Sequence, residues 1–173
     1  MDLIVEETSS ISGKVKPAPS KFYTQFATAI GFLSNGKTVI KSPLRVGDTR
    51  VLARSIDDMG ATAKRTEKKW TIWGLEENQS ISGHVFDAKN SAMCLSLMTS
   101  LSAFSTHIMI ITGNEQLRQR PMPSLIKPME KLGVEVHSTK QDDSPPLVVF
   151  EGNISGGKLD FGRDMDSFFL PAN

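Results

Sequence analysis

Apolar side chains recur at helical spacing in four stretches of the chain, which predicts helices over residues 21–33, 48–59, 91–104 and 124–132. Ser20 and Asp48 are expected to cap the first two helices, and Asn90 or Ser91 the third. The third stretch contains no charged side chain, which is typical of a helix that is buried on most sides. We expect Pro128 in the first turn of the fourth helix, because proline lacks the backbone donor that an interior position uses.

Short apolar segments bounded by turn residues predict strands between these helices. The expected strands cover residues 38–40, 61–66, 70–73, 107–112, 134–139 and 147–151. The second and third strands would pair as a hairpin, and so would the last two. This alternation of strands and helices predicts a mixed fold of the α/β (α+β) class.

Two short motifs repeat along the chain at nearly constant spacing. Ile-Ser-Gly occurs three times, separated by 70 and 73 residues, and each copy precedes a segment that we expect to be extended, over 14–16, 84–86 and 158–161. Met59-Gly60 and Leu132-Gly133 are also 73 residues apart. Each of these glycines stands where a left-handed residue would end a helix.

The shared offset predicts a structural unit of the form βαβαββ that occurs more than once. Residues 10–79 and 80–152 would each form a complete unit, and residues 153–173 would begin a third. Residues 1–173 would then be the N-terminal part of one domain. A repeat unit buries its apolar face against its neighbours, so we expect an apolar face that a C-terminal half or a second copy of the chain would cover.

Composition and charge exclude several classes of protein. The 173 residues include 20 Lys and Arg and 19 Asp and Glu, a net charge of +1, which excludes the strongly basic footprint of a general nucleic-acid coat. The charge is uneven, at +5 over residues 1–74 and −4 over 75–173. A single cysteine, Cys94, and three scattered histidines give neither a disulfide framework nor the ligand spacing of a metal site.

No membrane or targeting segment is expected. The N-terminus carries acids where a signal peptide carries bases, and its apolar run is short. The most apolar stretch, residues 92–111, is interrupted by seven hydroxyl or imidazole side chains. A membrane-spanning helix needs roughly 20 mostly apolar residues, so we expect a cytoplasmic protein.

Three segments resemble the enolpyruvyl transferase family, most closely the branch that acts on shikimate 3-phosphate. They are residues 13–21, the helix start at 48–50 with the Met-Gly-Ala at 59–61, and the most specific, residues 112–122, similar to the family's GDxxLxxRPM segment. The resemblance covers residues 10–172, the N-terminal part of an enzyme of two domains and over twice this length. It implies the family's inverse α/β barrel, with three βαβαββ units per domain, sheets outside and helices inside.

The resemblance also implies an activity. Family members move the enolpyruvyl group of phosphoenolpyruvate to the 5-hydroxyl of shikimate 3-phosphate, a step of the shikimate pathway to aromatic amino acids, in the cleft between their domains. Neither a cofactor nor a metal is implied, and nucleic acid and membranes are not expected partners. Both substrates are polyanions, so the site needs cationic side chains that neutralise them and hold their reacting carbons in reach.

Five residues of this chain match substrate-binding positions of the family. The resemblance places Lys21 against both substrates and Arg120 against phosphoenolpyruvate. Asn90 and Ser91 match the start of the NSGTT(M/L)R loop, whose backbone lies against phosphoenolpyruvate. Ser167 matches the second serine of the SSQ segment that holds the shikimate phosphate. The catalytic acid and base residues are expected in the C-terminal part.

Other positions depart from the family's pattern. Phe22 and Phe26 replace a serine and an arginine, Ser96 replaces the arginine that closes the loop, and residues 92–94 read Ala-Met-Cys in place of Gly-Thr-Thr. Asp166 and Phe168 flank Ser167 where the family has serine and glutamine. These changes remove cations and hydrogen-bond donors, and Asp166 adds a negative charge.

Two alternatives to the transferase stay open. The chain could be a divergent, non-catalytic relative that keeps the fold and binds another anion or a protein partner. It could also resemble the sister transferases that act on a UDP-sugar. The Arg-Pro-Met match at residues 120–122 and the absence of a cysteine-bearing loop argue against the UDP-sugar acceptor.

Overall fold

The computed structural model describes residues 9–75, 81, 85–150 and 154–159, with the single positions 4 and 7. The helices are α1 (Lys21–Leu33), α2 (Gly47–Asp58), α3 (Ala92–Ser102) and α4 (Pro123–Lys131), with a short 3-10 helix η1 (Leu117–Gln119). All four predicted helices are therefore confirmed within a few residues at their ends.

Seven strands form two sheets in the part of the chain that is described. Sheet A contains β1 (Lys37–Lys41), β2 (Thr62–Arg65) and β3 (Lys69–Trp73) in the order β1-β3-β2, with both pairs antiparallel. Sheet B contains β4 (Val85–Asp87), β5 (Met109–Thr112), β6 (Val136–Ser138) and β7 (Leu147–Val149) in the order β4-β5-β7-β6. Strand β4 is parallel to β5, and the other two pairs are antiparallel.

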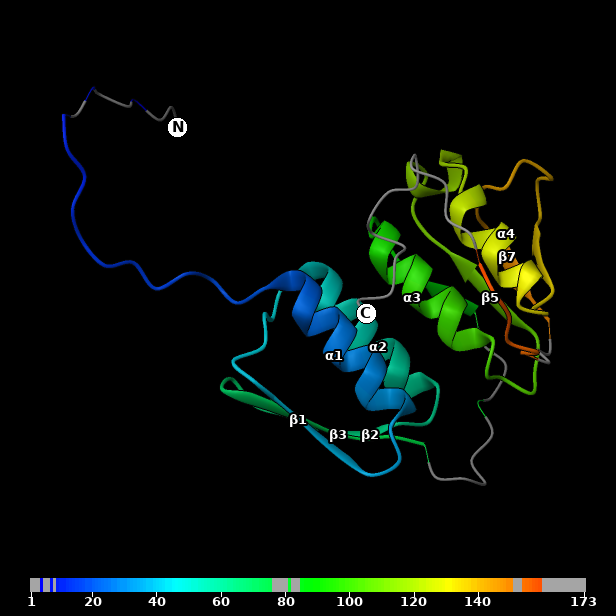
Figure 1. Cartoon of the computed structure of the whole chain (residues 1–173), viewed down its shortest axis with the longest axis horizontal. Helices are drawn as coiled ribbons and strands as arrows, with labels where there is room; N and C mark the ends of the chain where they lie inside the picture. Colours follow the sequence, from blue (N-terminus) through cyan, green and yellow to red (C-terminus); the bar gives the residue numbers. More distant parts are fainter. Residues whose placement is uncertain are drawn as a thin grey trace.

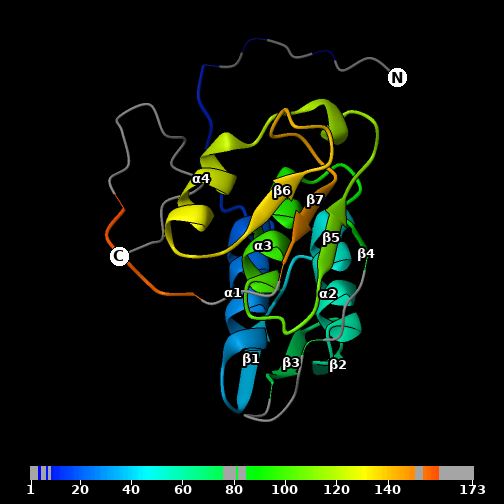
Figure 2. The same ribbon diagram turned by 90° about the vertical axis from the view of Figure 1, so that its right-hand side faces the viewer.

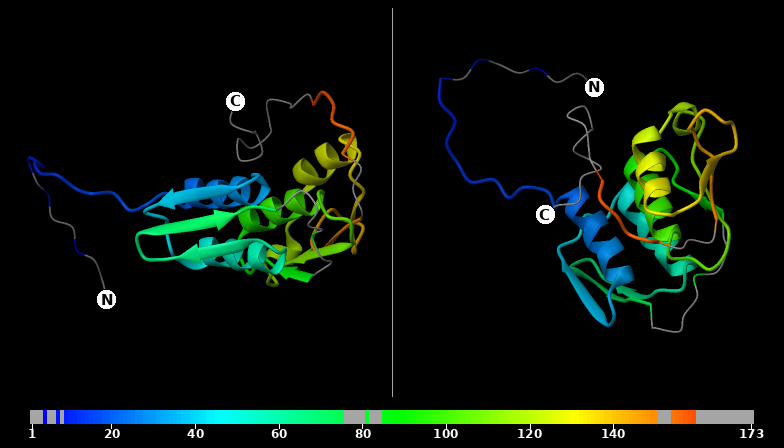
Figure 3. Two further views of the ribbon diagram at one scale, coloured as in Figure 1. Left: turned by 90° about the horizontal axis from the view of Figure 1, so that it is seen from below. Right: turned by 45° about the vertical axis from the view of Figure 1, so that its right-hand side comes forward.

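The helices α1, α2 and α3 lie between the two sheets, with their long axes side by side (Figure 1). Sheet B covers α3, and α1 and α2 lie on either side of it (Figure 2). The strands of sheet A lie together on the opposite side of the helices (Figure 3). This layering gives α3 eight buried residues out of eleven, which confirms that the uncharged helix is an interior one.

The two sheets confirm the internal repeat. The order β1-β3-β2 of sheet A corresponds to β5-β7-β6 of sheet B, with the same antiparallel pairing. Gly60 and Gly133 have φ angles of 106° and 91°, so both helices end at a left-handed residue that favours glycine. The mixed α/β fold and the βαβαββ order are thus visible in the second unit from β4 to β7.

The predicted first strand of the first unit is wrong. Residues 14–16 are in no strand, and residues 9–20 run away from the rest of the chain as an exposed segment (Figure 1). Ile11 and Val15 on this segment are each 91% exposed. A strand needs a neighbour for its backbone groups, and this segment does not pair with the free edge of β1, the edge that corresponds to the β4 edge of β5. The corresponding segment 158–161 lies partly outside the described residues, and Lys158 and Leu159 are in no strand.

Two predictions about helix ends also need correction. Asp48 does not cap α2, because the helix begins at Gly47 and Val46 is the capping residue. Pro128 is not in the first turn of α4, whose first residue is Pro123 and which contains Pro128 in its interior. A proline at the first helical position needs no backbone donor, which is why Pro123 begins the helix.

Candidate functional site

The N-terminal ends of α1, α2 and α3 lie together at one end of the helical layer (Figure 1). Lys21 begins α1, Asp48 is the second residue of α2, and Ser91 caps α3. The Lys21 ammonium forms an ion pair with the Asp48 carboxylate. Each helix contributes partial positive charge at its N-terminus, so three of them side by side favour an anion here.

Local hydrogen bonds fix the start of α2 against α1. The hydroxyl of Thr24, buried on α1, accepts the Leu44 backbone N–H at 3.0 Å, which ties the segment before α2 to α1. Thr49 accepts the Val46 N–H at 3.2 Å and lies 2.7 Å from the Leu44 carbonyl oxygen. The first turn of α2 is therefore held by Thr49, and the side chain of Asp48 is left to contact Lys21.

The Asp48 carboxyl is held in its charged form. Burial raises its pKa, but hydrogen bonds from the Lys21 and Ser91 side chains and the charge of Lys21 outweigh burial, so the pKa lies below its ordinary value. Lys21 itself is an ammonium with three donors, of which Asp48 needs one. The side chain of Lys21 is 46% exposed, so its remaining donors can reach an anionic ligand from solvent.

The turn before α3 rests on the segment after β5. The Asn114 N–H donates to the Lys89 carbonyl oxygen at 2.6 Å, and the Ala88 N–H donates to Thr112 at 2.9 Å. A Cβ added at Gly113 would lie 2.8 Å from the Lys89 oxygen, so this approach of two backbones requires glycine. The segment resembling GDxxLxxRPM thereby positions Asn90 and Ser91.

Of the five residues matched to substrate-binding positions, the structure brings Lys21 and Ser91 to Asp48, and Asn90 directly precedes Ser91 in the turn before α3. Arg120 follows η1, where its N–H donates to the Leu117 carbonyl oxygen at 3.1 Å, and its side chain is exposed. In the described part of the chain, no hydrogen bond or ion pair joins Arg120 to the other matched residues. Ser167 lies outside the described residues.

The structure also describes three of the residues that depart from the family's pattern. Phe22 and Phe26 on α1 are 41% and 36% exposed, so two partly exposed aromatic rings stand on this helix where the family has polar side chains. The Ser96 hydroxyl donates to the Ala92 carbonyl oxygen at 2.9 Å within α3, so its proton is already used inside the helix. Asp166 and Phe168 lie outside the described residues.

The sequence did not reveal the role of Asp48. Its position suggested a helix cap, whereas its carboxylate faces Lys21 and Ser91. A signal was available, because a lysine in the first turn of a helix is electrostatically unfavourable and calls for an acidic partner or an anionic ligand.

Cys94 is a core residue and not a nucleophile. Burial, with the charges of Asp48 and Asp87, raises the pKa of its thiol to about 12. The thiolate fraction at neutral pH is therefore very small. We expect no reaction with a thiol reagent at pH 8 in the folded chain and one equivalent in denaturant, measured by absorbance. Rapid labelling of folded protein would contradict this burial.

Within the described ranges, no group of three His, Cys, Asp or Glu side chains could hold a metal ion. None of the helices described is both long and apolar enough to span a membrane. The candidate site thus consists of a cation, helix N-termini and polar side chains, which suits a small anionic ligand.

Comparisons with known proteins agree with this geometry. The family model described as EPSP synthase (3-phosphoshikimate 1-carboxyvinyltransferase) matches residues 5–173. The chain is 33% identical to a 3-phosphoshikimate 1-carboxyvinyltransferase of Methanosphaera stadtmanae, over 98% of this chain and 40% of the relative. It is 34% identical to a protein of the same name from Halobacterium salinarum, over 95% of this chain and 38% of that one.

A solved structure shows the same fold. EPSP synthase from Acinetobacter baumannii superposes with a TM-score of 0.71 at 21% identity, over 81% of this chain and 32% of that chain. The chain therefore spans about 40% of the length of the curated relatives it matches. By the family match and the identity to these relatives, the chain belongs to the EPSP synthase family of enolpyruvyl transferases.

Proposed function

We propose that this chain is the N-terminal, substrate-binding portion of an enzyme that transfers the enolpyruvyl group of phosphoenolpyruvate to the 5-hydroxyl of shikimate 3-phosphate. The proposal rests on one observation: Lys21 lies where the N-termini of three helices, α1, α2 and α3, come together. Both substrates are phosphorylated anions, which this arrangement favours. The family membership supplies the reaction.

Each matched residue has a role in this proposal. Lys21 offers its free donors to the phosphates, and the backbone around Asn90 and Ser91 offers N–H groups at the start of α3. Arg120 clamps the carboxylate or phosphate of phosphoenolpyruvate in a bidentate geometry. Ser167 binds the phosphate of shikimate 3-phosphate. These groups neutralise and orient the substrates, while the acid and base chemistry belongs to the C-terminal part.

The C-terminal part is also the partner that α1 requires. Phe26, Ile30 and Leu33 form an apolar stripe along α1 with exposed fractions of 36%, 64% and 45%. The equivalent helix of the second unit, α3, is almost wholly buried. An exposed apolar stripe on a helix is typical of an interface. We infer that the remainder of the enzyme packs on this stripe, and that a second copy of the chain takes its place when the remainder is absent.

One set of observations favours a second function. Phe26 and Ser96 each replace an arginine of the family, and Phe22 replaces a serine, so two cations and a hydroxyl donor are removed; both rings are partly exposed, and the Ser96 hydroxyl is bonded within α3. A non-catalytic relative that binds a different anion at Lys21 would tolerate these changes. The two functions differ in whether shikimate 3-phosphate binds.

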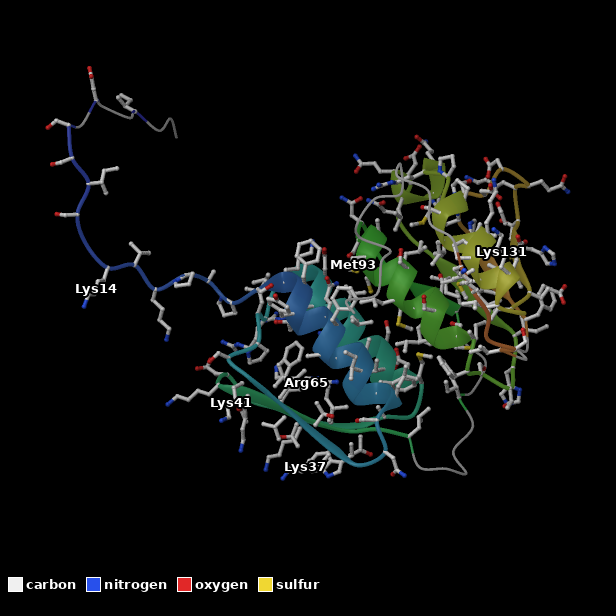
Figure 4. All side chains as sticks on the ribbon, viewed as in Figure 1. Lys14, Lys37, Lys41, Arg65, Met93 and Lys131 are labelled. Carbon is white, nitrogen blue, oxygen red and sulfur yellow. The ribbon has the colours of Figure 1, made fainter. Side chains whose placement is uncertain are left out.

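Replacing Lys21 by glutamine tests the site. We expect the chain to bind phosphoenolpyruvate and shikimate 3-phosphate in calorimetric titrations, and Lys21→Gln to weaken binding by about tenfold or more, since one charge-assisted hydrogen bond is lost. Lys14→Gln, on the exposed N-terminal segment (Figure 4), removes the same charge and should leave binding unchanged. Equal affinities in the wild type and Lys21→Gln would contradict the assignment, and binding of another phosphorylated anion alone would favour the second function.

A further inference from the structure

A hollow of about 490 Å³ lies between α2 and the hairpin of β2 and β3, away from Lys21. Its walls carry four arginines and two acids, so positive charge is in excess. The lining residues are Arg45, Arg50, Ala53, Arg54, Asp57, Arg65, Thr66, Glu67 and Trp70. Pockets of roughly 300–1,000 Å³ are the size that holds small molecules.

Arg65 lines this hollow, and both of its terminal nitrogens are hydrogen-bonded, whereas its buried Nε has no partner among the described residues. Its guanidinium donates to both oxygens of Asp57 at 2.6 and 2.7 Å and to the Ala53 carbonyl oxygen at 2.6 Å. It also lies 5.8 Å from the centre of the Trp70 ring. Figure 4 shows Arg65 between the helices and the strands of sheet A. Because the Asp57 carboxylate is paired with Arg65, it is not available to neutralise the other arginines.

The remaining arginines of the hollow are poorly neutralised. Arg50 and Arg54 are exposed one turn apart on α2, and neither has an ion pair with any residue that the structure describes. Among the described residues the ion pair of Arg45 is with Glu67, at 3.4 Å, and the Glu67 side chain is 84% exposed. Like charges at this spacing on a helix repel each other. An anion placed between the three guanidinium groups would remove this repulsion.

We propose that this hollow is a second anion site, which binds the phosphate or diphosphate group of a small molecule. Guanidinium groups match phosphate oxygens in bidentate geometry. Arg50 and Arg54, which have no ion pair among the described residues, line this hollow together with Arg45, whose one ion pair there is with the exposed Glu67. Thr66 also lines the hollow, but its hydroxyl donates to the Lys69 carbonyl oxygen at 3.0 Å, so the arginines are the donors that an anion would meet. The site is distinct from the Lys21 cluster, because neither Lys21 nor Asp48 lines the hollow although Asp48 is on the same helix. Occupation would link α2 to the turn of the β2–β3 hairpin.

Inorganic pyrophosphate and ADP are suitable probes in an NMR titration of the ¹⁵N-labelled chain. The indole N–H of Trp70 and the amides of α2 report on the hollow, and the amides around Lys21 report on the other site. We expect saturable shifts at Trp70 and an apparent Kd that rises about tenfold or more in Arg50→Gln/Arg54→Gln. Both arginines are exposed, so this double variant should keep its fold, which circular dichroism checks.

Two control variants distinguish binding in this hollow from general electrostatic attraction of an anion to the chain. Lys37→Gln/Lys41→Gln removes the same charge from exposed positions of β1 (Figure 4), and Lys21→Gln removes the other anion site. Both should leave the Trp70 titration unchanged. Tighter binding of ADP than of pyrophosphate would show that the site recognises an organic phosphate. Equal affinities for the two probes would show that it recognises the diphosphate group itself. An absent shift at Trp70, or an equal loss in the arginine and lysine variants, would overturn the proposal.

Discussion

Phe32→Ala is expected to lower the free energy of unfolding by about 3–5 kcal/mol, the range for phenylalanine-to-alanine changes in protein cores. Phe32 on α1 is fully buried, and it belongs to the continuous core of both units. Its removal loses the favourable free energy of transferring the ring out of water, and it leaves a cavity that the neighbouring helices and strands cannot fill. Urea denaturation followed by circular dichroism measures the change.

Leu33→Ala is the matched control for this variant. Leu33 is the next residue of α1 but is 45% exposed, so at a protein concentration at which the chain is monomeric its truncation should change the unfolding free energy by only about 0.5 kcal/mol. Similar losses in the two variants would contradict the orientation of α1 between the sheets. A loss below about 1 kcal/mol for Phe32→Ala would contradict its burial.

Gly74→Ala is expected to destabilise the first unit by about 3 kcal/mol, the upper end of the cost of overpacking. A Cβ at this position would overlap the Ser34 carbonyl oxygen and lie 2.8 Å and 2.9 Å from those of Phe32 and Gly31. These are backbone atoms at the end of α1, so relief requires the chain after β3 to move away from the helix. That movement would break the hydrogen bond from the Leu75 N–H to the Phe32 oxygen.

Gly31→Ala provides the comparison. A Cβ there meets only side-chain atoms, at 3.2 Å from Thr38 and 3.4 Å from Ile72, and alanine favours a helix over glycine. We expect a change within about 1 kcal/mol, because crowding and helix propensity oppose each other. Thermal unfolding of both variants measures the difference. A Gly74→Ala protein as stable as Gly31→Ala would show that the chain passes α1 less closely than described.

The helices and the repeat could be predicted because they depend on local features. Ser20, Gly60 and Gly133 cap or end helices through their own side chain or backbone, and the structure confirms all three positions. The first strand could not be predicted in the same way. Whether residues 14–16 form a strand depends on a neighbouring strand, and an apolar pattern does not show whether a neighbour is present.

The candidate site was predictable only in part. The resemblance indicated Lys21, Asn90 and Ser91, whose substrate-binding role stays a prediction, and the structure places Lys21 and Ser91 beside Asp48. Asp48 was missed as a partner of Lys21, because their contact joins two helices that are separated by a strand in the sequence. Contacts of this kind depend on how helices pack against each other, which the hydrophobic periodicity of the sequence does not specify. The arginine hollow depends in the same way on how α2 packs beside the β2–β3 hairpin.

Release of phosphate by the complete enzyme tests the central claim most directly. The chain would be joined in one polypeptide to the C-terminal part of the Methanosphaera stadtmanae relative that it does not cover, and folding would be checked by circular dichroism. We predict phosphate release that requires both phosphoenolpyruvate and shikimate 3-phosphate and falls about 100-fold or more in Lys21→Gln. A folded fusion that binds neither substrate in calorimetry and releases no phosphate would contradict the assignment of this chain as a substrate-binding portion.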